Sequence, residues 1–230
     1  MKYNDEEMNE LPYNLAIKYD KRKYCQYYIS LLKTKHILIF SFFQSNDYNS
    51  KIIKIDLFFI GFAIYYSVNC LFFNYETMHK IYENKGAFDF VYQLPKILYS
   101  SLVSIVLNSI LNLLALSNGG INKFKENRTK KNLDTRKADL EQKLRIKFIM
   151  HFILSFIMLI SFWYYIAMFG VIYKNTQLHL LKDTLISFGL SLIHPFAVYL
   201  VPGIFRIHSL SNPKKSRKLL YNFSKFIQLF

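Results

Sequence analysis

A few polar side chains lie inside otherwise apolar stretches of this 230-residue sequence, and their spacing limits the chemistry that they can do. Asn108 and Asn112 are four residues apart, so a helix places both on one face. Asn69 lies in a different apolar stretch. Amides in apolar helices usually hydrogen-bond across helix pairs, and we expect that role here. The alternative is that these amides line a conduction path for ions.

A histidine beside a proline interrupts the last apolar stretch. Pro195 lacks a backbone donor and opens the helix, and His194 lies next to that opening. A histidine in this position can bind a ligand or a proton. The simpler interpretation is a kinked helix in which His194 bonds a freed carbonyl or a neighbouring helix. The sequence favours the simpler interpretation, because spans commonly tolerate proline kinks.

Signatures of catalysis, cofactor binding and metal binding are missing from the sequence. It has no phosphate-binding glycine loop and no HExxH, GxSxG or CxxC motif. No Asp or Glu falls in the middle of an apolar stretch, which disfavours an ion-driven transporter because such proteins usually need an intramembrane carboxylate. We therefore predict a protein that is not an enzyme, with no catalytic residue, no cofactor and no metal.

Four apolar stretches must position the polar side chains. They are residues 52–73, 97–117, 148–173 and 184–205. About 20 apolar residues in a helix cross the roughly 30 Å hydrocarbon core of a bilayer. The chain is 52% hydrophobic, yet its net charge is +15 and the charges gather between these stretches. Strand-like alternation is absent, so the sequence predicts an all-α integral membrane protein with four transmembrane helices.

The segments outside the spans have distinct predicted roles. Residues 1–51 form an N-terminal segment in which tyrosines and leucines interleave with lysines before the short apolar patch 36–43. This mixture predicts an interfacial amphipathic helix; the alternative is a buried elbow beneath the first span. In the charged loop 123–147, residues 138–145 have the pattern of a helix that continues into the third span.

The distribution of basic residues predicts the orientation. Residues 1–54, 123–147 and 206–230 hold 25 of the 30 Lys and Arg, and the two other loops hold five. Since cytoplasmic flanks are enriched in Lys and Arg, we expect both termini in the cytoplasm. A plasma or ciliary membrane is favoured, with an organelle membrane as the alternative.

The C-terminal segment 206–230 is predicted to be a basic cytoplasmic tail. Its basic run is expected to contact anionic lipid headgroups, at ~1 kcal/mol per basic residue. The alternative is that the run only determines topology. No nucleic-acid partner is expected, because the basic residues flank spans and face lipid phosphate. The candidate lipid contacts are Lys214, Lys215, Arg217 and Lys218.

Two groups of short motifs resemble a known arrangement. The first group lies before the second span, and the second group lies in the third and fourth spans. The chain from residue 13 onward thereby resembles a C-terminal multi-pass module of large surface proteins predicted in single-celled eukaryotes such as ciliates, a module for which the resemblance implies no activity. The motifs are Tyr19-Asp20-Lys21-Arg22, Leu31-Leu32-Lys33-Thr34-Lys35-His36, Thr77-Met78-His79-Lys80-Ile81-Tyr82, Tyr92-Gln93-Leu94-Pro95, Phe162-Trp163-Tyr164-Tyr165, Lys182-Asp183-Thr184 and Pro202-Gly203-Ile204-Phe205-Arg206.

The order of features is also distantly similar to the first membrane bundle of the polycystin family. In both, a basic segment enters a span, and a long charged loop leads to a helix pair joined by a short outer loop. This resemblance implies a receptor-like or channel-accessory bundle rather than a pore. No lipid-binding β-sandwich precedes the spans in this sequence and no pore-type span follows them, which departs from the polycystin pattern.

These observations favour a non-enzymatic membrane anchor, receptor-like bundle or channel-accessory subunit. Its expected partners are the lipid bilayer and a membrane protein or further copies of the chain. The alternative is a small oligomeric transporter or ion channel in which Asn108, Asn112 and His194 face a shared path.

Overall fold

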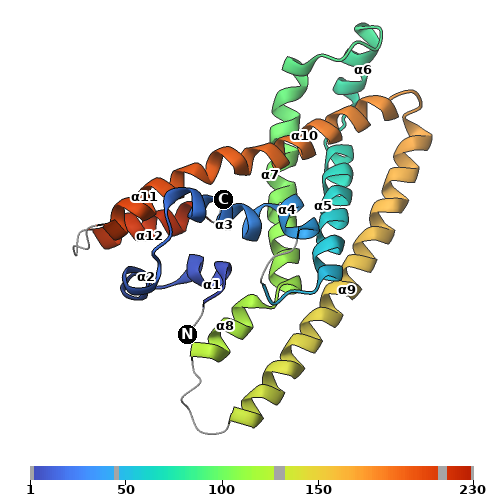
Figure 1. Cartoon of the computed structure of the whole chain (residues 1–230). Helices are drawn as coiled ribbons and strands as arrows, with labels where there is room; N and C mark the ends of the chain where they lie inside the picture. The colour runs from blue at the N-terminus through green and yellow to red at the C-terminus, as the bar shows by residue number, and fades with distance from the viewer. Residues whose placement is uncertain (1–2, 44–46, 127–132, 212–216, 229–230) are drawn as a thin grey trace. The chain divides into compact units, whose positions relative to one another are not determined.

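The computed structural model describes residues 3–43, 47–126, 133–211 and 217–228, and these residues form helices joined by short turns (Figure 1). No strand occurs among them. The helices are α1 (Asp5–Glu10), α2 (Tyr13–Tyr19), α3 (Tyr24–Lys35), α4 (Ile37–Phe42), α5 (Lys51–Leu71), α6 (Tyr75–Glu83), α7 (Phe90–Ala115), α8 (Asn118–Glu126), α9 (Leu133–Ile172), α10 (Gln177–Val198), α11 (Leu200–Ser211) and α12 (Arg217–Ile227).

Four helical stretches are long and apolar enough to cross a membrane. They are α5, α7, α9 and the stretch Gln177–Ser211, which comprises α10 and α11. The all-α membrane class and the four transmembrane helices are thereby confirmed. The interfacial location of the N-terminal helix stays a prediction, although a helix does form at Tyr24–Lys35.

The helices extend beyond the predicted spans, mostly at their N-terminal ends. α7 begins at Phe90 and α10 at Gln177, seven residues before each predicted start. α9 is a single helix of 40 residues, so the charged segment 138–145 continues into the third span as expected. At ~1.5 Å per residue, a helix of that length reaches about 60 Å, twice the hydrocarbon thickness of a bilayer. Part of α9 therefore lies outside any hydrocarbon core.

The chain divides into two compact units, which we describe separately. The first comprises residues 1–54 and 192–230, and the second comprises residues 55–191. In the second unit α5 is the most enclosed span, since 56% of its most apolar stretch is buried. Only 11% of the corresponding stretch of α9 is buried, and Trp163 and Tyr164 are exposed on it. α9 therefore presents a broad apolar surface outward.

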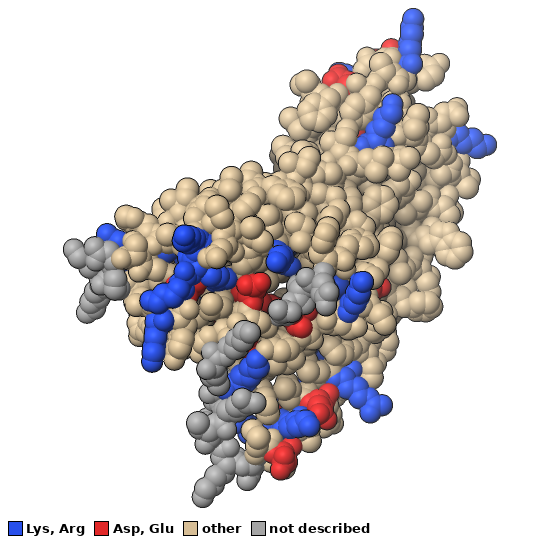
Figure 2. Space-filling view, in the orientation of Figure 1, with Lys and Arg blue, Asp and Glu red and all other residues tan. Residues whose placement is uncertain are grey.

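Charged residues are scarce on that surface. α9 carries no charged residue from Phe148 to Ile172, and Figure 2 shows that most of the visible surface away from the clustered Lys and Arg is uncharged. Such a large apolar face is stable against lipid or a partner helix rather than against water. The second unit therefore has an apolar surface that matches the membrane environment predicted from the apolar stretches.

In the first unit, α3 lies along the end of the last span. Two tyrosines of α3 and the histidine that follows it donate hydrogen bonds to backbone carbonyls that are four residues apart on the last span. The distances are 3.0 Å from Tyr24 Oη to Leu200, 3.0 Å from Tyr28 Oη to Phe196, and 2.8 Å from His36 Nε2 to Leu192. Because successive donors move down α3 while the carbonyls move back along the span, the two run antiparallel. The opposite face of α3 leaves Ile29 and Lys33 exposed. α3 is thus half packed on protein.

Candidate functional site

A buried ion pair joins α7 to α10 in the second unit. Lys96 Nζ pairs with the carboxylate of Asp183, and each is the seventh residue of its helix. The Asp183 side chain is fully buried and that of Lys96 is nearly so. Lys96 Nζ also lies 4.4 Å from the centre of the Phe73 ring, a cation–π distance. An ionisable pair inside a span is costly unless it is matched, so this pair is a primary candidate site.

One helical turn further on, an amide bridges the same two helices. Asn69 on α5 accepts a hydrogen bond from Ser100 Oγ at 2.8 Å, and its Nδ2 lies 2.7 Å from Ser187 Oγ. All three side chains are buried. Ser100 and Ser187 each follow the ion-pair residue of their helix by four positions, so both contacts lie on one face of each helix. We call Asn69, Ser100 and Ser187 the Asn69 cluster.

Next to the ion pair, a surface hollow of about 990 Å³ opens between α6 and the turn that joins α9 to α10. Aromatic and basic side chains line it, including Tyr75, Tyr82 and Lys174. His179 also lines it, one helical turn before Asp183. Within the part of the chain that the structure describes, the buried Nδ1 of His179 has no hydrogen-bond partner. An unsatisfied polar atom therefore belongs to a side chain that lines the hollow.

A second polar contact joins α5 to α9. His151 is fully buried, and its Nε2 lies 2.9 Å from Oδ2 of Asp56. His151 lies within one turn of the predicted start of the third span, and this position predicts an interfacial role. The pairing shows that its ring packs inside the second unit against a carboxylate of another helix, and the interfacial role stays a prediction.

Among the described residues, only one of the predicted intramembrane polar residues contacts polar groups of other helices. Asn69 does so, through the Asn69 cluster. Asn108 and Asn112 are half-buried on α7, and Asn108 Nδ2 donates to the Ser104 carbonyl of its own helix at 2.9 Å. His194 is exposed on α10. Pro195 lies within α10, which ends three residues later at Val198.

The predicted lipid-binding run is described only in part. Lys214 and Lys215 lie outside the described residues. Arg217 and Lys218 begin α12, a short amphipathic helix that packs on α11. Arg217 Nη1 donates to the His208 carbonyl at 2.8 Å, while Lys218 is exposed. The predicted tail therefore includes a folded helix.

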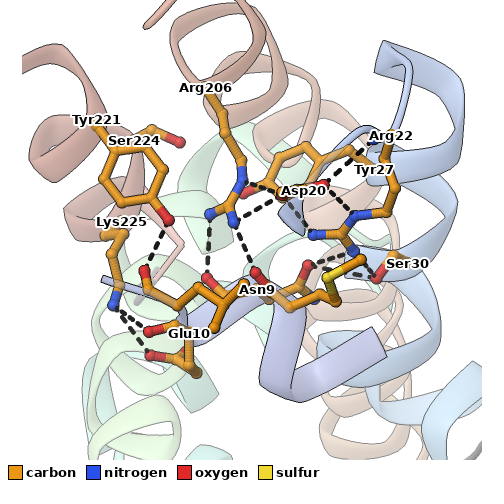
Figure 3. Close-up of polar contacts among 12 residues, drawn as sticks. Asn9, Glu10, Asp20, Arg22, Tyr27, Ser30, Arg206, Tyr221, Ser224 and Lys225 are labelled. Carbon is orange, nitrogen blue, oxygen red and sulfur yellow. Dashed lines mark hydrogen bonds and ion pairs between the residues drawn. The ribbon is translucent and has the colours of Figure 1, made fainter. Parts of the chain in front are cut away.

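The first unit contains a polar cluster around Arg206, which is fully buried (Figure 3). Its guanidinium bonds Asp20 through Nε at 2.9 Å, and its other nitrogens donate to the carbonyls of Asn9 at 3.0 Å and Met8 at 2.6 Å. The rings of Tyr27 and Tyr221 lie within 5 Å of the guanidinium carbon. Arg206 thereby joins the last span to the N-terminal segment and to α12.

A second arginine shares the same carboxylate. Arg22 bonds both oxygens of Asp20, at 2.8 and 2.9 Å, and its Nη1 donates to Asn9 Oδ1 and to Ser30 Oγ. Burial by itself raises the pKa of Asp20, but the hydrogen bonds and charges of Arg22 and Arg206 outweigh burial and hold that pKa below its ordinary value. Asp20 is therefore ionised at neutral pH. We call Asp20, Arg22, Tyr27, Arg206 and Tyr221 the Arg206 cluster.

Two further contacts extend the hydrogen bonds around this cluster. Tyr221 Oη donates to the Leu11 carbonyl at 2.7 Å, and burial raises the pKa of Tyr221 to about 12. Lys225 Nζ donates to the Glu10 carbonyl at 2.8 Å. α12 is thus bound to the segment that links α1 and α2.

Sequence reasoning does not identify the ion pair, the His151–Asp56 contact or the Arg206 cluster as sites. A usable signal exists for the ion pair. Lys96 and Asp183 each immediately precede a predicted span, and both of these spans run in the same direction. Opposite charges at equal depth on neighbouring helices favour pairing. No comparable signal identifies the Arg206 cluster, because its members are far apart in sequence.

No group of three or more His, Cys, Asp or Glu side chains arranged to hold a metal ion is present in residues 3–43, 47–126, 133–211 and 217–228. Comparison of the chain with protein-family models, curated proteins and solved structures gave no match. The site is therefore interpreted from its own geometry.

Loss of the bridging amide should weaken the second unit modestly. We expect Asn69→Leu to lower the free energy of unfolding by about 1 kcal/mol, because two interhelical hydrogen bonds disappear. Asn108→Leu is the matched control, since its amide bonds only its own helix. The measurement is the thermal unfolding midpoint in detergent. Equal midpoints for the two variants would contradict the bridging role of Asn69.

Proposed function

We propose that the chain is a non-enzymatic membrane module that acts as a receptor-like bundle or channel-accessory subunit, with both termini in the cytoplasm. The observation that supports this proposal is the mutual binding of polar side chains inside the second unit. Lys96 pairs with Asp183, and Asn69 bridges Ser100 and Ser187. Polar groups that satisfy one another across helices act to hold a bundle together. The likeness to the first polycystin bundle is in keeping with this role and stays a proposal.

The hollow beside the ion pair favours the receptor-like form of the proposal. It is lined by α6 and by the turn between α9 and α10, which lie on the side away from the cytoplasm in the proposed orientation. His179, whose buried Nδ1 has no partner among the described residues, is one of the side chains that line this ligand-sized space of about 990 Å³. A ligand bound there would lie one helical turn from Asp183. The exposed apolar face of α9 offers a surface for a partner helix or for lipid.

The alternative is an oligomeric channel or small transporter. One observation favours it: His194 is exposed within the last span, where a second copy of the chain would cover it. Intramembrane histidines often belong to ion or proton paths. In that arrangement the path lies between copies rather than within one copy.

Ion flux in liposomes separates the two functions. The purified protein should give no flux above that of empty liposomes if it is a bundle without a path of its own. Flux that His194→Ala abolishes, and that His208→Ala leaves unchanged, would instead establish the channel. His208 is the matched control because it is also an exposed histidine in the stretch Gln177–Ser211. Tags on both termini that are accessible only after permeabilisation of cells would support the proposed orientation.

A further inference from the structure

A basic hollow lies beside the Arg206 cluster, within the first unit. Its volume is about 430 Å³, and it is formed by α1, by the link between α2 and α3, and by α3. Lys21, Arg22 and Lys33 line it with one carboxylate, that of Asp5. The lining side chains thus carry an excess of two positive charges. An anion of matching size is the ligand that this charge favours.

The charge of Arg22 is only partly balanced by its protein partners. Arg22 and Arg206 share the single carboxylate of Asp20, so these three side chains together carry a net charge of +1 (Figure 3). A buried positive charge without a full counter-charge is costly. An anion in the hollow would lie against Arg22 and supply the missing negative charge.

The guanidinium of Arg22 is held in place before any ligand arrives. Four of its five N–H groups donate to Asp20, Asn9 and Ser30, at 2.8 to 2.9 Å. One N–H of Nη2 is left to donate to a ligand oxygen, and a guanidinium already held by hydrogen bonds loses little entropy on binding. Lys33 is exposed with no ion pair of its own among the described residues. Arg22 therefore gives the site its geometry, and the lysines add charge.

The rim of the hollow is apolar. Tyr19 and Ile29 are partly exposed there, and Met8 also contributes to the lining. α3, which carries Ile29, is hydrogen-bonded along the end of the last candidate span through Tyr24 and Tyr28. The hollow therefore lies on a helix attached to a membrane-spanning element. A ligand with both a phosphate and an acyl chain fits such a rim better than free phosphate does.

We propose that this hollow binds the phosphate of an anionic phospholipid, with Arg22 on the phosphate, Lys21 and Lys33 beside it, and the start of the acyl chain against Ile29. This site is separate from the basic run around Lys218. It does not depend on the proposed receptor-like function, because binding is measured on the purified chain whatever its activity.

The test compares two double variants of equal charge. Lys21→Gln with Lys33→Gln removes two lining lysines, while Lys23→Gln with Lys51→Gln removes two exposed lysines of the same unit that do not line the hollow. Binding of short-chain phosphatidylserine to the full chain in neutral detergent is measured by native mass spectrometry. We expect about 30-fold weaker binding for the first variant, since each lysine contributes roughly fivefold. The control variant should bind as the natural chain does.

Two outcomes would overturn the proposal. Equal loss of binding in both double variants means that the lipid responds only to overall charge. Inorganic phosphate that competes with the lipid at equal concentration means that the site binds phosphate without regard to the acyl chain. Both lining lysines are exposed, so unchanged unfolding midpoints will show that the variants are folded. Arg22→Gln is left out of the comparison because Arg22 also belongs to the Arg206 cluster.

Discussion

Replacing Lys96 with methionine should destabilise the second unit by about 3 kcal/mol or more, because it leaves the fully buried carboxylate of Asp183 without its counter-charge. For a chain of this length the thermal unfolding midpoint should fall by about 6–12 °C. The double variant Lys96→Met with Asp183→Leu should recover most of the loss. Apolar residues of similar size often replace a buried ion pair at little cost.

The neighbouring lysine supplies the control for this experiment. Lys182 is exposed, with its Nζ 5.9 Å from the centre of the Phe88 ring, so Lys182→Met should change the midpoint little. The measurement is the fraction of protein that stays monodisperse in detergent after heating. If the double variant is no more stable than Lys96→Met alone, the loss of stability does not come from the unpaired charge of Asp183. If Lys96→Met matches Lys182→Met, the pairing itself is wrong.

The class of protein is predictable from the sequence because the apolar stretches are long and uninterrupted. The ends of the spans are less predictable, and the reason is physical. Lys96 and Asp183 look like natural boundaries, since a single charge in hydrocarbon is costly. In the structure each charge cancels the other, so α7 and α10 both continue past them. The boundary of a span therefore depends on a partner helix that the local sequence does not reveal.

The contacts of polar residues within the spans also depend on partner helices. Asn69 bonds to side chains of two other helices, which fits the general need of an amide in an apolar helix for a partner. Its partners Ser100 and Ser187 come from helices far along the chain. The regular spacing of Asn108 and Asn112 defines a face of α7, but spacing alone does not say whether a neighbouring helix covers that face. They are only half-buried in the structure.

The Arg206 cluster cannot be predicted from local sequence patterns. By its position after an apolar stretch, Arg206 resembles any basic residue that ends a span. Its burial results from α1, α3 and α12 packing around α11, and Asp20 is 186 residues away. The cluster shows that the N-terminal and C-terminal segments fold together in the first unit. The tail, which has the basic composition of a topology signal, is therefore also structural.

Replacing Arg206 with methionine should release the N-terminal segment from the last span. The change removes the hydrogen bonds to the Met8 and Asn9 carbonyls and the charge between Tyr27 and Tyr221. Removal of one member of a buried charged network costs about 3–5 kcal/mol, so the first unit should open at ordinary temperatures. Limited trypsin digestion in detergent should then cut near Lys18 and Lys21 at least tenfold faster.

Two comparison variants make the Arg206 experiment decisive. Arg217→Met removes a basic residue whose guanidinium makes one hydrogen bond to the described residues, to the His208 carbonyl, and should leave the digestion rate unchanged. Arg206→Lys keeps the charge but lacks the fork that reaches Asp20 and both carbonyls, so its rate should fall between the other two. If all three variants are cut at the natural rate, Arg206 does not hold the segment. A graded series would show that the donor geometry of Arg206, as well as its charge, joins the two ends of the chain.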